Sequence, residues 1–219
     1  VIPKSLLRDR EEGGYLLSRK LVSYKNSNAV VIGIPHGGVC VAAAIAEQLS
    51  LPLEAMPCLK IKDPADSGKN IGSVSEDEVF IHDGEQTIPQ DYVFHQIAHL
   101  RNIILHEKTN YDTGKHIGLR YRPVILVDDV LTFSDTMMAC LLSIRKQNPM
   151  KIIVAVPVVS AEAAQIISAA ADDLQFLKIE ASLGSPKTYF ENFPRVDEQR
   201  VKELLEISKK HIGTSEHAH

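Results

Sequence analysis

Short apolar segments alternate with amphipathic segments along most of this chain. Segments rich in Val, Ile and Leu predict buried strands, and segments with apolar residues three or four apart predict helices. The predicted strands are residues 29–34 (AVVIGI), 53–62, 123–127 (PVILV), 151–159 (KIIVAVPVV) and 174–179. The predicted helices are residues 6–24, 39–49, 89–108, a segment ending near 147, 161–171 and 197–210. This alternation predicts an α/β fold, a parallel sheet with helices on both faces.

Two stretches depart from the alternation. Residues 71–83 predict an extended excursion or hairpin with a turn at Glu76-Asp77, and residues 111–121 predict a loop. Hydrophobic residues make up 44% of the chain and charged residues 24%, as is usual for a globular protein. No change in composition divides the 219 residues, so we expect a single domain over residues 1–219.

The overall charge narrows the possible functions. The net charge is −4, aromatic residues are 5% and there is no Trp, so we expect no nucleic-acid binding face. No apolar run reaches membrane-spanning length and no signal-peptide pattern opens the chain, so we expect a cytoplasmic protein without a membrane partner. Cysteines occur only in apolar segments and are interpreted as buried free thiols: Cys40, Cys58 and Cys140.

Polar residues follow three of the predicted strands, at the edge where open parallel sheets bind ligands. Gly37 and Gly38 come after the first strand. Paired glycines let backbone N–H groups approach an oxyanion, although a tight turn alone also requires them. Lys60 and Lys62 end the second strand, next to a polar loop. They suit a charged substrate under a lid of about residues 60–72, or a solvated edge.

The third strand end carries the most specific pattern. Four apolar residues, 124–127, run into two adjacent carboxylates, Asp128 and Asp129. A buried strand should not end in two acids without a polar partner, and ribose hydroxyls or a magnesium ion would supply one. The helix after the following turn has free N–H groups that can hold a phosphate. The acid pair therefore predicts a binding site for a phosphorylated ligand.

This stretch, VILVDDVLTFSDTM, resembles the phosphoribosyl-pyrophosphate (PRPP) motif of type I phosphoribosyltransferases. GIPHGGVCVAAAIAEQL resembles the pyrophosphate loop and first helix of a bacterial subgroup of that family, and PLEAMPCLKIK through NIGSVSEDEVF resembles its second strand and flexible loop. YFENFPRV resembles its C-terminal aromatic segment. The resemblance implies a Rossmann-like, parallel-sheet type I phosphoribosyltransferase core with a small hood at about residues 183–196.

The resemblance also implies a Mg²⁺-dependent homodimer that transfers a 5-phosphoribosyl group from PRPP to an unidentified base and releases pyrophosphate. Asp128 and Asp129 would hold the ribose hydroxyls, steady the transition state and reach a Mg²⁺ ion that binds mainly through PRPP. The 5′-phosphate would bind the turn formed by Leu131, Thr132, Phe133, Ser134, Asp135 and Thr136. The pyrophosphate would face His36, Gly37, Gly38, Lys60 and Lys62. The base would bind in a pocket with Tyr189 and Phe190.

The turn after the acid pair is degenerate with respect to the family pattern Asp-Asp-Gly-(Ile/Leu)-Ala-Thr-Gly-Ala-Thr. Val130 and Ser134 replace its glycines, Phe133 replaces its phosphate-binding threonine, and Asp135 adds a carboxylate at the helix start. A carboxylate there favours the helix but repels a phosphate if it points at the site. The alternative function is therefore an inactive module that binds a nucleotide, PRPP or another anion, as a sensor or partner subunit.

Two further groups are interpreted as surface features. One is a stripe of helix histidines, which lacks nearby acids and cysteines at metal-ligand spacing, so solvated side chains are favoured over a zinc site: His95, His99 and His106. The other is interpreted as an exposed helix face with local ion pairs: Arg8, Arg10, Glu11 and Glu12.

Overall fold

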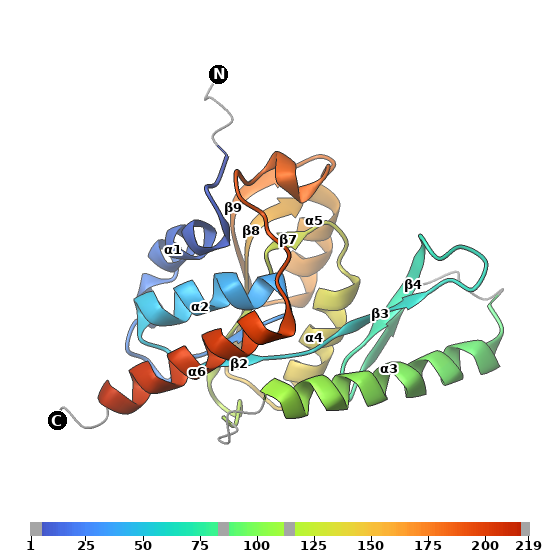
Figure 1. Cartoon of the computed structure of the whole chain (residues 1–219), viewed down its shortest axis with the longest axis horizontal. Coiled ribbons are helices and arrows are strands. Elements are labelled where there is room, and N and C mark those ends of the chain that lie inside the picture. The colour runs from blue at the N-terminus through green and yellow to red at the C-terminus, as the bar shows by residue number, and fades with distance from the viewer. Residues whose placement is uncertain (1–5, 83–87, 112–116, 216–219) are drawn as a thin grey trace.

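The structure is a computed structural model that describes residues 6–82, 88–111 and 117–215, with side chains described as far as residue 210 (Figure 1). A six-stranded sheet has the order β2-β1-β6-β8-β7, and β9 pairs with β8. Its strands are β1 (Val30–Gly33), β2 (Leu53–Ala55), β6 (Pro123–Val127), β7 (Val130–Leu131), β8 (Lys151–Ser160) and β9 (Asp173–Glu180). Every pairing in it is parallel, which confirms the predicted parallel sheet.

Helices cover both faces of this sheet. The helices of the described residues are α1 (Arg10–Lys20), α2 (Gly37–Leu49), α3 (Gln90–Tyr111), α4 (Asp135–Lys146), α5 (Ala161–Ala170) and α6 (Glu198–Ser215), with short 3-10 turns at Val22–Tyr24 and Pro186–Thr188; of these, α3 packs against a second, smaller sheet. Successive residues of β1 enter different cores, because strand side chains alternate. Val31 packs with α1, α2 and α6, whereas Val30 and Ile32 pack with α4 and α5. The predicted α/β architecture is confirmed.

The predicted strand 53–62 is wrong as a single element. It divides into β2 in the main sheet and β3 (Leu59–Lys62) in a second, antiparallel sheet. Pro57 lies in the break, and proline cannot donate to a strand ladder. β3 pairs with β4 (Asn70–Val74), which pairs with β5 (Val79–Ile81). The β4–β5 hairpin closes with a Ser75 N–H to Glu78 carbonyl bond of 2.9 Å, which confirms the predicted turn at residues 76–77.

The first helix begins at Arg10 rather than at residue 6. Asp9 caps it, because its carboxylate accepts a hydrogen bond of 2.8 Å from the Glu12 N–H. The preceding residues bond to the C-terminal segment instead, where the Leu7 N–H donates to the Tyr189 carbonyl at 2.9 Å. The two-residue strand β7 was not predicted. Residues 112–116 of the predicted loop lie outside the described residues.

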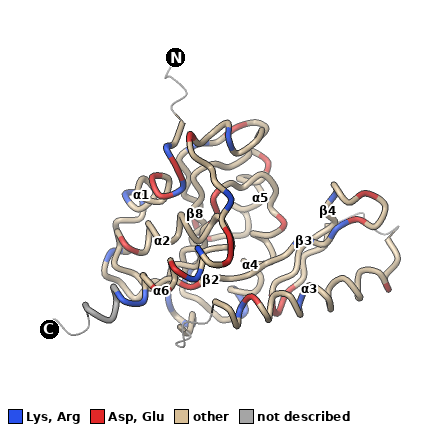
Figure 2. The backbone as a smooth tube through the Cα atoms, viewed as in Figure 1, with Lys and Arg blue, Asp and Glu red and all other residues tan. Residues whose placement is uncertain are grey.

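Two further observations concern the whole described chain. None of its helices combines the length and the apolar character that a membrane span requires. Lys and Arg are interspersed with Asp and Glu along the helices and loops (Figure 2). The absence of a nucleic-acid partner stays a prediction.

Candidate active site

The acid pair Asp128–Asp129 directly follows β6, in which all five residues are buried. The Asp128 carboxylate accepts a hydrogen bond of 2.8 Å from the Asp129 N–H. Burial raises the pKa of Asp128 well above its ordinary value and the charge of Asp129 raises it further, whereas Lys60 lowers it. Lys60 therefore compensates the buried charge only in part. A cation or hydroxyl donors from a ligand would stabilise the ionised pair.

The glycine turn after β1 packs directly on these acids. A Cβ at Gly37 would lie 1.9 Å from a carboxylate oxygen of Asp129. A Cβ at Gly38 would lie 2.7 Å from the Val127 carbonyl oxygen and 2.9 Å from the Asp128 Cα. Any side chain at either position would displace the acids, so both positions require glycine for close approach. Two motifs that are far apart in the sequence thus form one site.

Arg10 is part of this site, so its interpretation as an exposed helix residue is wrong. Its Nε donates to an Asp129 carboxylate oxygen at 2.7 Å, and their side chains are only 10% and 16% exposed. Its Nη1 donates to the Pro194 carbonyl at 2.8 Å, and its guanidinium lies 3.6 Å from the centre of the Phe193 ring. Arg10 therefore joins the acid pair to the C-terminal aromatic segment. The sequence gives no signal for this, because the partners are 119 and 184 residues away.

Lys60 and Lys62 lie on one face of β3, and both are exposed. Lys60 is close enough to Asp128 for its charge to lower the pKa of that carboxyl. The Lys62 carbonyl accepts a hydrogen bond of 2.9 Å from the Tyr92 hydroxyl. The predicted lid is only partly a loop, because residues 60–62 and 70–72 belong to β3 and β4.

The turn after the acid pair is bonded to β8. Val130 and Leu131 form β7, which pairs with residues 158 and 159 of β8. The Ser160 hydroxyl donates to the Thr132 carbonyl at 2.9 Å. Leu131 is buried, Thr132 and Thr136 are half-buried, and Phe133 is 61% exposed. Ser134 is the N-cap residue of α4 and makes no capping bond with its side chain, so its hydroxyl leaves the first N–H groups of the helix open to an anion.

Asp135, the first residue of α4, is buried, with an exposed fraction of 4%. Its carboxylate pairs with Nε2 of His82 at 2.8 Å. Its carbonyl accepts a hydrogen bond of 2.6 Å from the buried Ser73 hydroxyl. Ser73 belongs to β4 and His82 follows β5, so the second sheet holds Asp135. A proton on His82 would reduce the repulsion that this carboxylate exerts on a phosphate at the helix start.

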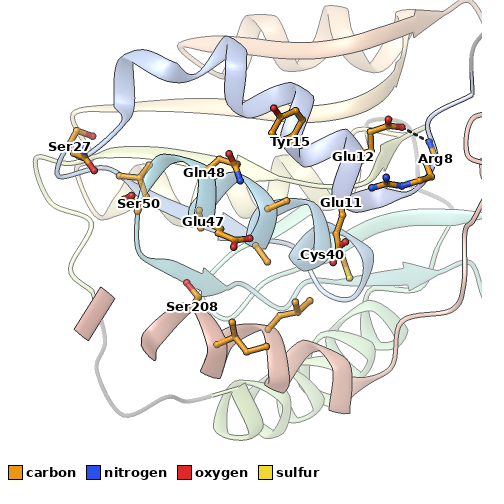
Figure 3. A pocket seen from close by; sticks show the side chains of 17 residues that line it. Arg8, Glu11, Glu12, Tyr15, Ser27, Cys40, Glu47, Gln48, Ser50 and Ser208 are labelled. Carbon is orange, nitrogen blue, oxygen red and sulfur yellow. Dashed lines mark hydrogen bonds between the residues drawn. The ribbon is translucent and has the colours of Figure 1, made fainter. Parts of the chain in front are cut away.

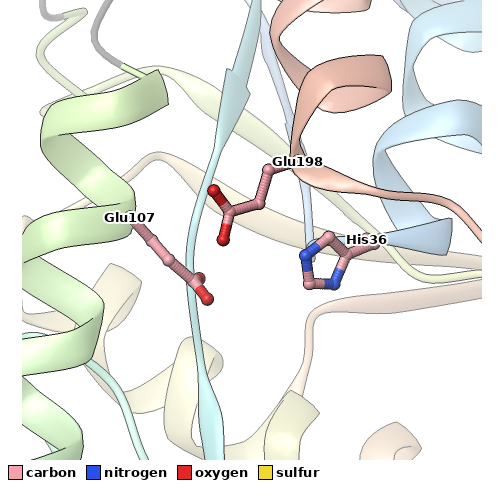
Figure 4. A group of neighbouring side chains, drawn as sticks. All are labelled: His36, Glu107 and Glu198. Atoms are coloured by element: carbon pink, nitrogen blue, oxygen red, sulfur yellow. The ribbon is translucent and has the colours of Figure 1, made fainter.

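The imidazole of His36 lies beside two carboxylates, Glu107 of α3 and Glu198 of α6 (Figure 4). One ligand atom from each of the three residues lies within 4.8 Å of the others. The pKa of Glu107 is raised, mainly by burial. The charge of His36 opposes this shift, and the charge of Glu198 adds to it. Sequence reasoning expected His36 to face a pyrophosphate and did not identify the two glutamates, since three distant segments converge here.

The aromatic residues predicted to form the base pocket, Tyr189 and Phe190, are buried, with exposed fractions of 3% and 1%. They pack with Val158, and the half-buried Leu7 and Phe193 cover the cluster. Stacking of a base on Tyr189 or Phe190 would require these rings to leave the cluster. Phe193 is already partly exposed, and Arg10 links it to the acid pair.

A cavity of about 790 Å³ lies between α1, α2 and α6 (Figure 3), and the acid pair is not part of its lining. Its charged lining consists of three carboxylates and one guanidinium: Glu11, Glu12, Glu47 and Arg8. A cavity with this excess of negative charge would repel an anionic ligand. The candidate active site is therefore at the acid pair.

Comparison with known proteins identifies similar sequences and structures. A family model described as "Phosphoribosyl transferase domain" matches residues 11–182, which include the glycine turn and the acid pair. Proteins from two strains of Mycobacterium tuberculosis that carry the provisional name phosphoribosyl transferase are 24% identical over 206 residues. The match covers 92% of this chain and 46% of theirs. The chain thus spans about half the length of the curated relatives it matches.

Solved structures show the same fold. The structure of TT1426 from Thermus thermophilus matches with a TM-score of 0.78 and 27% identity, over 92% of this chain and 98% of that one. The AQ2163 protein from Aquifex aeolicus matches with a TM-score of 0.51 and 11% identity, over 81% and 77% of the two chains. The second likeness concerns the fold alone.

Proposed function

Because the chain belongs to the phosphoribosyl transferase domain family, we propose that it transfers a 5-phosphoribosyl group from PRPP to a nitrogenous base and releases pyrophosphate. The contact of Gly37 and Gly38 with Asp129 and Asp128 carries this proposal. It joins a turn suited to an oxyanion to carboxylates suited to ribose hydroxyls. The departing pyrophosphate and the sugar would then bind side by side.

The acid pair would act on the sugar. Its carboxylates would accept hydrogen bonds from the ribose hydroxyls and face the positive charge that develops as the bond from ribose C1′ to pyrophosphate breaks and the bond to the base forms. Arg10 holds Asp129 at 2.7 Å and so fixes its orientation. Asp128, whose charge is the less well compensated, would gain most from the developing positive charge.

The two phosphate groups would bind on either side of the acids. The pyrophosphate would accept hydrogen bonds from the N–H groups of Gly37 and Gly38, with positive charge from Lys60 and Lys62. His36 would contribute its backbone, since its imidazole faces two carboxylates. The 5′-phosphate would bind the turn at residues 131–136, where the N-terminus of α4 contributes about 0.3–1 kcal/mol or more.

Magnesium is the ion that a reaction of this family would use, and the residues fit it. Adjacent carboxylates offer the oxygen ligands that Mg²⁺ prefers, and Lys60 only partly compensates the buried Asp128. Bound Mg²⁺ would neutralise charge on the pyrophosphate leaving group. Asp128 and Asp129 would hold the ion, directly or through oxygen atoms of PRPP.

The alternative is a module that binds PRPP, a nucleotide or another anion without turnover, as a sensor or partner subunit. The specific observation in its favour is the altered turn, in which Phe133 stands exposed and Asp135 is held by His82. Binding of PRPP without release of pyrophosphate, across a panel of purine and pyrimidine bases, would favour this alternative over the transferase.

Calorimetric titration with PRPP and Mg²⁺ tests the proposed site. We expect binding below millimolar PRPP, and at least about 100-fold weaker binding for the Asp128→Asn/Asp129→Asn double variant, because each charged acceptor contributes roughly 1.5–3 kcal/mol. Asp173→Asn is the matched control, since Asp173 begins β9 at the opposite edge of the sheet. Absence of binding at millimolar PRPP would overturn the transferase function, and unchanged binding by the double variant would place the site elsewhere.

Two glycine-to-alanine variants test the contact between the glycine turn and the acid pair. Gly37→Ala places a methyl group against Asp129, so PRPP binding should weaken at least about tenfold and stability should fall by about 1–3 kcal/mol. Gly118→Ala is the control, because a Cβ there meets nothing within 4 Å. Equal PRPP affinities for the two variants would show that the glycine turn does not contribute to the site. The homodimer and the cytoplasmic location stay predictions.

A further inference from the structure

Three side chains from distant segments meet next to the glycine turn. His36 precedes the turn, Glu107 lies near the end of α3, and Glu198 is the first residue of α6 (Figure 4). One ligand atom of each lies within 4.8 Å of the other two. Glu107 is buried, His36 is half-buried and Glu198 is exposed. The cluster therefore extends from the interior to the surface, and an ion could enter from solvent.

The cluster has an excess of negative charge. Two carboxylates lie beside one imidazole, so even a protonated imidazole would leave ionised carboxylates in excess, and neither carboxylate forms an ion pair with Lys or Arg within the described residues. Glu107 lies one turn from the C-terminal end of α3, where the helix dipole disfavours a negative charge. A positive partner would stabilise the ionised form of a buried carboxylate in this position.

The hydroxyl of Tyr111 adds an independent observation. Tyr111 is 6% exposed, and among the described residues its hydroxyl has no hydrogen-bond partner. Burial raises the pKa of this hydroxyl, and the charges of Glu107 and Glu198 raise it further, so it lies within range of both carboxylates. Unpaired buried hydroxyls are rare in folded proteins. A water molecule bound to an ion in the cluster would give this hydroxyl a partner.

The separations suit a shared ion better than direct bonds. Among the described residues, His36 makes no ion pair with either glutamate within 4.0 Å. Metal–ligand bonds to nitrogen and oxygen are about 2.0–2.2 Å long, so two ligands of a tetrahedral ion are separated by roughly 3.4 Å. The three ligand atoms lie within 4.8 Å of one another, so small side-chain rotations that shorten these separations by up to about 1.4 Å would let them bind one ion.

We propose that His36, Glu107 and Glu198 form a binding site for a divalent first-row transition metal ion, of which Zn²⁺ is the probe. An imidazole nitrogen among the ligands disfavours Mg²⁺ and Ca²⁺, which prefer oxygen. The ion would cancel the two negative charges and connect the glycine turn to α3 and α6. The site lies outside the acid pair, and its existence does not depend on the proposed transferase activity.

Titration of chelator-treated protein with Zn²⁺ tests this site. We expect one equivalent to bind through the cluster, and binding at least about tenfold weaker in Glu198→Gln, because a ligand is lost. Glu198 is exposed, so this variant should fold. Glu206→Gln is the matched control, since Glu206 is an exposed carboxylate on the same helix outside the cluster. Glu107→Gln tests the buried ligand in the same way.

A second control excludes the surface histidines. His95 and His99 are exposed on α3 with a spacing of four residues and could bind Zn²⁺ as a pair. His99→Gln should keep wild-type affinity, and Zn²⁺ should raise the melting temperature of His99→Gln and Glu206→Gln more than that of Glu198→Gln. The proposal is overturned if no Zn²⁺ binds, if Glu198→Gln binds like the wild type, or if His99→Gln loses the ion. Equal affinity for Mg²⁺ and Zn²⁺ would also contradict it.

Discussion

The acid pair and the turn that follows it are adjacent in the sequence, but their surroundings differ. In the acid pair, Arg10 pairs with Asp129 at 2.7 Å, but Lys60 compensates the buried Asp128 only in part. In the turn, by contrast, two polar groups have partners from neighbouring elements: Ser160 bonds the Thr132 carbonyl, and His82 pairs with Asp135.

This difference indicates which of the two regions contributes more to ligand binding and which contributes more to the fold. The acid pair keeps a requirement for polar partners that a ligand can meet, which agrees with a binding site. In the turn, the Thr132 carbonyl and the Asp135 carboxylate already have partners in β8 and next to the second sheet. A phosphate bound there would therefore add less stabilisation than a ligand at the acid pair. We therefore expect substitutions near the acids to change stability and binding strongly, and substitutions in the turn to act weakly.

Arg10→Met should have the largest effect on stability. It leaves the Asp129 carboxylate, 16% exposed, without its cation, and it removes the bond to the Pro194 carbonyl. Loss of one partner from a buried pair costs about 3–5 kcal/mol. Arg8→Met is the control, because Arg8 pairs with Asp9 on the surface at 62% exposure, where solvent screens the pair and its loss should change stability little. Urea unfolding measures both, and a cost below about 1 kcal/mol for Arg10→Met would contradict the role of Arg10.

Asp128→Asn should stabilise the chain near neutral pH by about 0.5–2 kcal/mol, at the cost of function. Burial and the charge of Asp129 raise the folded pKa of Asp128 above its unfolded value of 3.8. In the window above pH 3.8 the folded wild type binds more protons than the unfolded chain, so its stability falls as pH rises through the folded pKa. The asparagine variant does not titrate, and its advantage should appear across this window and persist above it.

Asp172→Asn is the control, and it should change stability near neutral pH in the opposite direction, as a loss. Burial would raise the pKa of Asp172, but hydrogen bonds from the Ile152 N–H and Arg145 lower it overall. The carboxylate of Asp172 therefore contributes stability above its unfolded pKa, and this contribution is lost as pH falls through the folded pKa. Urea unfolding of both variants at several pH values tests the pair. A loss of stability in Asp128→Asn at neutral pH would show that the acid pair is already compensated.

Local sequence patterns predicted β6 and the glycine turn correctly, because both depend on residues close together in the chain. The bounds of β6 agree with the predicted strand 123–127, because a run of β-branched residues that ends in acids is visible within a few positions. The glycine turn was found for the same reason. In contrast, β7 is only two residues long and exists because β8 lies alongside it. Its formation depends on tertiary pairing, which no local pattern reports.

Charged residues were harder to predict, since their environment depends on distant segments. Arg10 begins an amphipathic helix and has the sequence of a surface residue, but Pro194 and Phe193 cover it. The direction of Asp135 was left open in the sequence, and the second sheet determines it through His82. Glu107 and Glu198 meet His36 only because the end of α3 and the start of α6 both lie at the glycine turn.

Phe133→Thr should have the smallest effect, and it tests whether the turn can still bind a phosphate. The ring is 61% exposed, so its loss should change stability by less than about 0.5 kcal/mol. A threonine hydroxyl at this position could donate one hydrogen bond to the 5′-phosphate, worth about 0.5–1.5 kcal/mol, and PRPP affinity should rise by roughly two- to tenfold. Phe94→Thr on α3, where the ring is 67% exposed, is the matched control. If calorimetry finds the same PRPP affinity for Phe133→Thr and Phe94→Thr, then the 5′-phosphate does not bind at residue 133, and the acid pair and glycine turn must account for the affinity without the turn.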